Sequence, residues 1–211
     1  MDKVGIPDRI PAPRGRFTHG WPSQGCGRKV LVAYPRSVPD PIPSPQPYRV
    51  TVVCLGNICR SPLGEVVLRD RVARAGLADR VVVDSAGTGD WHIGHDADPR
   101  ARDTAATHGY DMDHRARQIT EEWFADIDLA IAMDEHNYAD LQRLIARSGC
   151  EVDLRMMRSF DPDLAHLPEP HPDLAVPDPY YGGADDFVTV LGMLERASDG
   201  LAAELAERLT P

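Results

Sequence analysis

Several ingredients are scarce in this chain, and each scarcity excludes a class of protein. Four cysteines, at positions 26, 54, 59 and 150, are too few and too scattered for a disulfide framework. No second Cys or His pair lies at partner spacing to Cys54 and Cys59, so we expect no zinc site. No apolar run approaches membrane-spanning length, and the polar, proline-rich start lacks the apolar stretch of a signal peptide. We therefore expect a cytoplasmic protein with no membrane contact, and export by another route is the open alternative.

Lysine is absent from position 48 onward, where the chain has sixteen arginines and thirty acidic side chains. Residues 1–47 carry seven basic and three acidic side chains instead, and the whole chain has a formal net charge of -10. Binding to nucleic acid depends on neutralising phosphates, so the acidic part argues against a nucleic-acid partner. An anionic substrate would be held by a local cluster of donors rather than attracted by the overall charge.

Proline divides the chain at about residue 47. Ten of the nineteen prolines precede Tyr48, and those between 35 and 47 are spaced as in an extended linker. We predict that residues 1–47 form a disordered extension, with at most one short strand at 29–34. A ligand for a proline-binding module is the alternative for this segment. Residues 48–211 are predicted to fold as one domain.

Within residues 48–211, strand and helix patterns alternate. Short apolar or β-branched runs predict strands at 49–55, 80–84, 127–133 and 152–157. Apolar side chains at helical spacing predict helices at 61–76, 99–108, 134–147 and 187–209. Ser61 is expected to cap the first helix, with Pro62 in its first turn. The alternation predicts an α/β fold whose parallel sheet is covered by helices on both faces.

The segment that follows the first strand has the features of a phosphate-binding loop. Cys54 is followed by five residues, then by Arg60 and a hydroxyl. The spacing alone is weak, but the segment leads from a strand into a helix, where backbone N–H groups attract anions. Gly56 and Asn57 tolerate a positive φ, so the loop can curl into a nest of amides. Cys54 as a buried strand-end thiol with Arg60 on the surface is the plainer alternative.

These residue types suit phosphate transfer. Amides, the helix N-terminus and Arg60 favour the Cys54 thiolate, which can attack phosphorus and form a covalent intermediate. The planar fork of Arg60 matches two phosphate oxygens, and Ser61 can hydrogen-bond the sulfur. The departing oxygen needs a proton, for which Asp178, held beside Pro179, is the candidate donor. An ordinary Asp-Pro turn is the other interpretation of that segment.

Four segments together resemble the low-molecular-weight protein tyrosine phosphatases of the bacterial type. The segments are residues 54–62, 84–88, 114–117 and 178–180, in the family's order and spacing. The resemblance covers about residues 48–209 and implies a doubly wound, four-stranded parallel sheet in the order 2-1-3-4. Leu55 departs mildly from the family pattern, which often has a small hydroxyl residue at a position expected to contribute only its backbone.

The resemblance also implies a role for each matching residue. Cys54 would be the nucleophile, Arg60 the phosphate clamp, and Asp178 the acid in the first step and the base in the second. The supporting set of the phosphate loop would be Leu55, Gly56, Asn57, Ile58, Cys59, Ser61, Ser85 and His114. The substrate rim would consist of Trp91, Tyr180 and Tyr181. Cys59 would also be a redox partner that traps an oxidised Cys54 as a disulfide. No metal or cofactor is implied.

Ile58 bears on the choice of substrate. Relatives with phosphoarginine activity carry Thr at this position, whereas Ile accompanies a preference for phosphotyrosine. The expected partner is therefore a phosphotyrosine-containing protein, with a tyrosine kinase of the same cell as one candidate, and the enzyme is expected to be a monomer or a weak dimer. Three alternatives stay open: an arsenate reductase with Cys150 in a cysteine relay, a non-catalytic phosphotyrosine-binding module, and an enzyme for small aryl or acyl phosphates.

Two acidic positions near the predicted site are assigned structural roles. Asp98, before Pro99, is predicted to start a helix, and the cluster that it forms with His92, His95 and Asp96 is interpreted as a solvated loop rather than a metal site. Asp134 is predicted to cap the helix that follows it, with a supporting role at the edge of the sheet left open.

Overall fold

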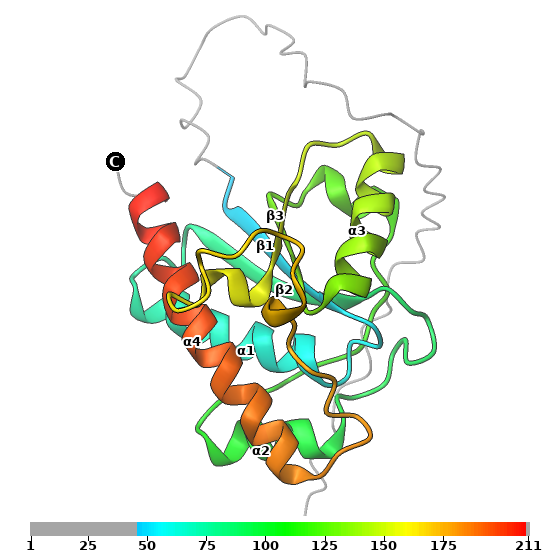
Figure 1. Ribbon diagram of the computed structural model, residues 1–211, viewed down its shortest axis with the longest axis vertical. Helices are drawn as coiled ribbons and strands as arrows, with labels where there is room; N and C mark the ends of the chain where they lie inside the picture. The colour runs from blue at the N-terminus through cyan, green and yellow to red at the C-terminus, as the bar shows by residue number, and fades with distance from the viewer. Residues whose placement is uncertain (1–45, 210–211) are drawn as a thin grey trace, which may run out of the picture.

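The computed structural model describes residues 46–209 (Figure 1). The predictions of a disordered extension, of a strand at 29–34 and of a segment for a proline-binding module therefore lie outside the described residues, apart from the last two positions of the extension. No helix among residues 46–209 combines the length and the apolar character needed to cross a membrane.

Four parallel strands form one sheet at the centre of the fold. They are β1 (Tyr48–Cys54), β2 (Val81–Gly87), β3 (Leu129–Ala132) and β4 (Asp153–Met156), in the order β2-β1-β3-β4. Every pairing is parallel. Between β1 and β2 the paired residues extend from Tyr48 opposite Val81 to Cys54 opposite Gly87. The predicted sheet and its strand order are thus confirmed.

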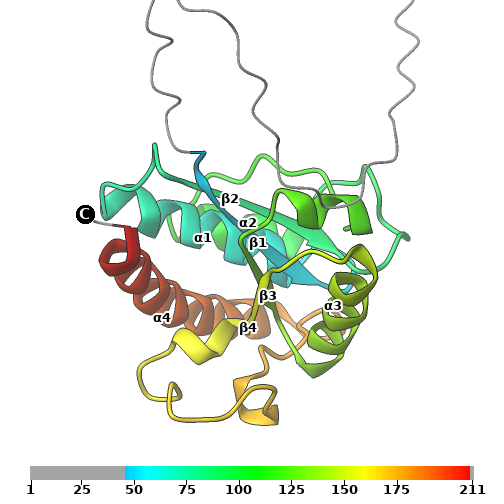
Figure 2. The same ribbon diagram turned by 90° about the horizontal axis from the view of Figure 1, so that it is seen from above.

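Helices cover both faces of this sheet (Figures 1 and 2). On one face α1 (Arg60–Arg74), α2 (Pro99–Thr107) and α4 (Ala184–Leu209) contact one another, and on the other α3 (Glu135–Ser148) packs beside the short helix η1 (Glu121–Ala125). Alternate β1 side chains enter the two cores: Val50 and Val52 join the α1 and α4 side, and Val53 joins the α3 side. Both faces of the central strand are therefore buried.

Close packing fixes α1 over the sheet. A Cβ added to Gly64 would lie 3.0 Å from Met133 Cε and 3.1 Å from a Val52 methyl group, so a larger residue here would require these side chains to shift. Because α1 begins directly after the loop that follows β1, its position sets where that loop and its two ends lie.

Element bounds agree with the predicted ones to within three residues. The predicted cap of the first helix, however, is wrong. α1 begins at Arg60 after Cys59, which makes no capping hydrogen bond, and Ser61 lies inside the first turn. The Ser61 hydroxyl instead faces Cys54 Sγ at 3.0 Å and the Ala86 carbonyl at 3.3 Å, so its hydrogen bonds go to these groups and not to a backbone N–H of the helix.

Candidate active site

The loop between β1 and α1 holds the two most reactive side chains of the predicted site. Cys54 ends β1 and Arg60 begins α1, and each is only 3% exposed. Asn57, between them, has a φ of 54°, the left-handed region that asparagine tolerates better than most residues. This turn directs the Asn57 backbone N–H at Cys54 Sγ, 3.3 Å away. The strand, the turn and the helix thus surround the sulfur with hydrogen-bond donors.

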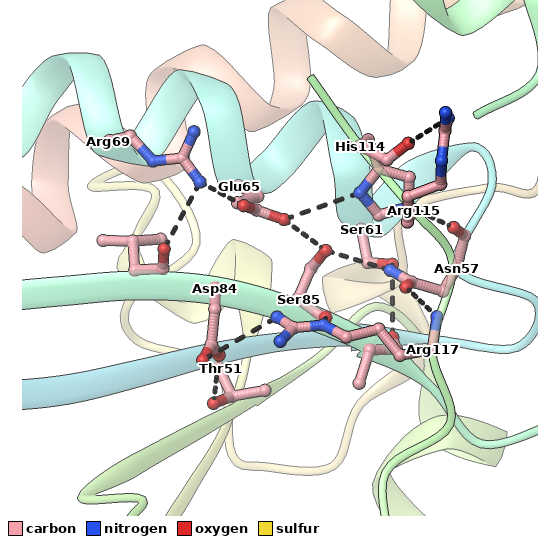
Figure 3. A network of polar contacts seen from close by, with 12 residues as sticks. Thr51, Asn57, Ser61, Glu65, Arg69, Asp84, Ser85, His114, Arg115 and Arg117 are labelled. Carbon is pink, nitrogen blue, oxygen red and sulfur yellow. Dashed lines mark hydrogen bonds and ion pairs between the residues drawn. The ribbon is translucent and has the colours of Figure 1, made fainter. Parts of the chain in front are cut away.

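Asn57 is the centre of the polar network that holds the loop (Figure 3). Its Oδ1 accepts the Arg117 backbone N–H at 2.9 Å, which fixes the orientation of the amide. Its Nδ2 must therefore donate to the hydroxyls of Ser61 and Ser85, each at 2.9 Å. Because Ser61 receives this hydrogen bond, its own proton is free to point at Cys54 Sγ, and a charged sulfur is a stronger acceptor than the Ala86 carbonyl.

Behind Asn57 lies a second layer, in which Ser85 and His114 were predicted as support for the loop and Glu65 and Arg69 were not. The Ser85 hydroxyl donates to Glu65 Oε2 at 2.5 Å, and Arg69 forms an ion pair with the same carboxylate. His114 Nε2 donates to the Asn57 carbonyl at 2.7 Å, while its Nδ1 lies 3.8 Å from Glu65 Oε2. Burial lowers the pKa of His114, against the opposing effects of the Asn57 carbonyl and Glu65. Glu65 points inward from α1, and a carboxylate on a buried helix face signals a polar partner.

Arg60 contacts acidic groups from two distant segments. Its NH1 donates to Asp134 Oδ2 at 2.5 Å and to the Val176 carbonyl at 3.2 Å, and its NH2 donates to Asp178 Oδ2 at 2.9 Å. Burial disfavours the charged guanidinium, but Cys54, Asp178 and Asp134 outweigh this effect and raise the pKa of Arg60. Asp134 also accepts the Asn137 N–H at 2.8 Å. It therefore caps α3, as predicted, and orients Arg60 as well.

These groups open into a pocket of about 260 Å³. Its lining combines the loop, the candidate acid, the three aromatic side chains that were predicted as the rim, and His92, which was not predicted there. The lining residues are Cys54, Leu55, Gly56, Ile58, Cys59, Arg60, Trp91, His92, Asp178, Tyr180 and Tyr181. Trp91 is 67% exposed and Tyr181 95% exposed, whereas Cys54 is buried at the floor. The structure thus brings every predicted rim and catalytic candidate to one cavity, with Ser85 and His114 behind the loop.

No group of three or more His, Cys, Asp or Glu side chains within residues 46–209 is arranged to hold a metal ion. The rings of His92 and His95 lie 5.8 Å apart, and Asp98 caps α2 by accepting the Arg100 N–H at 2.9 Å. The predicted helix start at Asp98 is therefore confirmed.

Comparison with known proteins identifies the group to which this arrangement belongs. The family model described as "Low molecular weight phosphotyrosine protein phosphatase" matches residues 49–210. The chain belongs to this family. A low molecular weight protein-tyrosine-phosphatase of Streptomyces coelicolor is 49% identical over 162 residues, which are 77% of this chain and 96% of that protein.

Solved structures of similar fold span the same part of the chain. The crystal structure of YfkJ from Bacillus subtilis has a TM-score of 0.69 and 31% identity, and the match covers 78% of this chain and 98% of that one. The structure of a Drosophila arginine phosphatase matches with a TM-score of 0.66 and 26% identity over 74% and 96% of the two chains. Proteins similar to this chain are thus named for different phosphorylated residues, tyrosine in the Streptomyces protein and arginine in the Drosophila protein.

Gly87 lies directly beneath the loop, and we expect Gly87→Ala to displace it. The added Cβ would lie 2.7 Å from the Leu55 carbonyl oxygen and 3.0 Å from the Asn57 nitrogen, so the backbone of the loop would have to move. We expect a loss of about 10²-fold in kcat/KM, because small misplacements of reacting groups cost that much. Steady-state kinetics checks this. The control is Gly192→Ala on α4, whose Cβ meets no atom within 4 Å; equal activity of the two variants would contradict the expectation.

Cys59 is only 4% exposed, and its thiol should make the free energy of unfolding depend on pH in the alkaline range. Burial, together with the charges of Asp98, Cys54 and Asp178, raises the pKa of this thiol well above its ordinary value. Above a pH of about 8.5 the unfolded chain releases a proton that the folded chain keeps, so the free energy of unfolding should fall by up to about 1.4 kcal/mol per pH unit.

Denaturant unfolding in reducing buffer between about pH 8 and pH 10 measures this slope; below the lower limit both states keep the thiol proton. In Cys59→Ala the loss of side-chain packing lowers stability equally at every pH, but the titrating group is gone, so the free energy of unfolding should fall less steeply over this pH range. Parallel curves for the two proteins would show that another group causes the fall.

Proposed function

We propose that this chain is a protein-tyrosine phosphatase that works through a cysteinyl-phosphate intermediate. The observation that carries the proposal is the pocket floor, where Cys54 Sγ faces the Asn57 N–H and the Ser61 hydroxyl beside Arg60 and Asp178. The donors that face the sulfur can also bind phosphate oxygens, so nucleophile and phosphate would meet at this point.

In the first step the Cys54 thiolate attacks phosphorus and the bond from phosphorus to the aryl oxygen breaks. Arg60 holds two phosphate oxygens through its planar fork, and the amides of the loop hold the others. Asp178 gives its proton to the departing oxygen, so phenol rather than phenolate leaves. In the second step Asp178 takes a proton from water as the water oxygen attacks phosphorus. The bond from phosphorus to sulfur then breaks, and the Ser61 hydroxyl stabilises the restored thiolate.

The charged side chains of the pocket are paired with one another. Arg60 donates to the Asp178 carboxylate at 2.9 Å, so a phosphate dianion has to take over this guanidinium fork. Once displaced from Arg60, the Asp178 carboxyl is free to face the leaving-group oxygen. Substrate binding therefore prepares the acid for its first task.

The depth of the pocket favours phosphotyrosine. Cys54 is buried at the floor while Trp91 and Tyr181 stand exposed at the rim, a distance that suits a phenyl phosphate better than the short side chain of phosphoserine. Ile58 in the lining supplies an apolar wall for the ring. Phosphoarginine is the rival substrate, since one structural neighbour is named an arginine phosphatase. A tyrosine kinase as partner and a monomer or weak dimer stay predictions.

The position of Cys150 disfavours an arsenate reductase with a cysteine relay. Cys150 precedes β4, whereas Cys54 ends β1, and the two strands are parallel members of one sheet. The two thiols therefore lie at opposite ends of the parallel strands, and Cys150 lines a surface hollow together with Tyr48, at the start of β1. A relay needs thiols within reach of each other.

Phosphate release from matched phosphotyrosine, phosphoserine and phosphoarginine peptides, with EDTA and a reducing agent present, tests the proposal. Turnover of the tyrosine peptide alone is the expected result. Preference for phosphoarginine would keep the chemistry and overturn the interpretation of Ile58. No turnover of any peptide by reduced protein would leave the phosphotyrosine-binding module, and turnover restricted to small aryl or acyl phosphates would exclude a protein substrate.

A further inference from the structure

The segment that carries Asp178 has little structure of its own. Between η3 (Pro172–Leu174) and the start of α4 at Ala184 there is no helix or strand, and the Asp178 side chain is 44% exposed. Two local hydrogen bonds shape it: the Tyr180 N–H donates to Asp178 Oδ1 at 3.2 Å, and the Gly182 N–H donates to the Pro179 carbonyl at 2.9 Å. Neither bond ties the segment to the rest of the fold.

Up to Asp178 the segment is held by the Val176 N–H, which donates to the Met133 carbonyl at 2.7 Å, and by Arg60, which donates to Asp178. Beyond Asp178 the tie is Arg100, in the first turn of α2. Its NH2 donates to the Tyr180 carbonyl at 2.9 Å and its NH1 to the Gly182 carbonyl at 2.8 Å. The two acceptors flank Tyr181, two and four positions after the candidate acid. The guanidinium also lies over the buried Phe187 ring, 4.8 Å from its centre, at the beginning of α4. Figure 1 shows α4 beginning beside α2, so one side chain spans the gap.

Asp98 fixes the orientation of this guanidinium. Its Oδ1 accepts from Arg100 Nε at 2.9 Å and its Oδ2 from NH2 at 2.7 Å, a two-point contact that leaves the outer N–H groups for the carbonyls. These hydrogen bonds hold the pKa of Asp98 below its ordinary range against the effect of partial burial. The Asp98 backbone N–H donates to the Ile58 carbonyl at 2.8 Å, inside the phosphate loop. Asp98 and Arg100 thus connect the phosphate loop to the segment of Asp178.

We infer that Arg100 is a positioning residue for the general acid, holding the segment 178–183 so that the Asp178 carboxyl stays above the phosphate loop. The inference rests on the proposed function. Arg100 itself does not line the pocket, so it acts through Asp178 and not on the phosphate. The part of catalysis that it supports is therefore proton donation to the leaving group.

Leaving groups of different acidity separate this role from a general structural one. Phenol has a pKa of about 10, like the tyrosine side chain, and departs poorly without a proton. A dinitrophenyl phosphate releases an anion that needs no proton. We expect Arg100→Gln to lower kcat/KM for phenyl phosphate about 10²-fold, the loss typical of a displaced catalytic group, and to change it little for dinitrophenyl phosphate.

The decisive experiment is a double-mutant cycle on kcat/KM, which reports the steps up to phosphoryl transfer. In an Asp178→Ala background, Arg100→Gln should have no further effect on phenyl phosphate, because the group that it positions is gone. Arg100→Lys, which keeps the charge but lacks the fork, should lose part of the activity. The matched control is Arg102→Gln, because Arg102 is exposed on the same helix and, among residues 46–209, forms an ion pair only with Asp96, at 3.5 Å.

An equal loss on both substrates, or a full additional loss in the Asp178→Ala background, would overturn the inference and leave Arg100 a structural residue. Inhibition by inorganic phosphate in the single variants shows whether the phosphate loop is intact. Failure of the proposed function gives a different result, since the unmodified protein would then hydrolyse neither phosphate ester.

Discussion

Cys54→Ser should reduce hydrolysis of aryl phosphates to background while leaving the site folded. Serine has nearly the shape of cysteine, but its hydroxyl stays protonated where the thiol ionises, so the attacking anion is lost. Removal of a nucleophile that acts within a catalytic unit costs roughly 10⁴- to 10⁶-fold in kcat. The measurement is phosphate release from a phosphotyrosine peptide under reducing conditions.

The architecture of the loop explains why this variant should still bind phosphate. Asn57 holds the loop through Ser61, Ser85, His114 and Arg117, and none of these contacts uses the sulfur. Titration calorimetry with inorganic phosphate should therefore show retained binding. Cys150→Ser is the matched control and should keep full activity. Clear turnover by Cys54→Ser would mean that another group is the nucleophile.

Local patterns in the sequence were enough to predict the elements that place the loop. The run of valines in β1 and the apolar spacing of α1 both depend on side chains that enter one core, and each pattern is complete within a short window. The strand order, in contrast, came from the resemblance to a family. Nothing in the periodicity of β1 or β3 says that they are neighbours.

Contacts between distant segments could not be predicted in this way. Arg60 was expected to hold phosphate, but its partners Asp134 and Asp178 lie 74 and 118 positions further along the chain. Ser61 was misassigned as a helix cap because a hydroxyl before Pro62 also fits a cap, although its contact with the Cys54 sulfur was predicted from the phosphate-loop pattern. Asp98 was predicted as a cap correctly, but the hydrogen bonds of its neighbour Arg100 to the carbonyls of Tyr180 and Gly182, 80 and 82 positions further along, are evident only in the folded chain.

Asp178→Ala should separate chemistry from binding more sharply than any other variant. Without the acid, kcat/KM for phenyl phosphate should fall by about 10²- to 10⁴-fold, the usual contribution of a positioned proton donor. Inorganic phosphate, however, should bind more tightly than to the unmodified protein. Asp178 occupies one arm of the Arg60 fork at 2.9 Å, and its removal frees that arm and removes a negative charge facing the anion.

Steady-state kinetics with phenyl phosphate measures the first effect. Phosphate inhibition constants, measured with dinitrophenyl phosphate so that the weakened variant still turns over, measure the second. Asp186→Ala is the matched control, because this carboxylate accepts the Gly183 N–H at 2.7 Å at the far end of the same segment and does not contact Arg60. Weaker phosphate binding by Asp178→Ala would mean that the carboxylate supports the anion site rather than competing for Arg60. In that case the ion pair between Arg60 and Asp178 would be a structural brace for Arg60, and substrate binding would not release the acid from it.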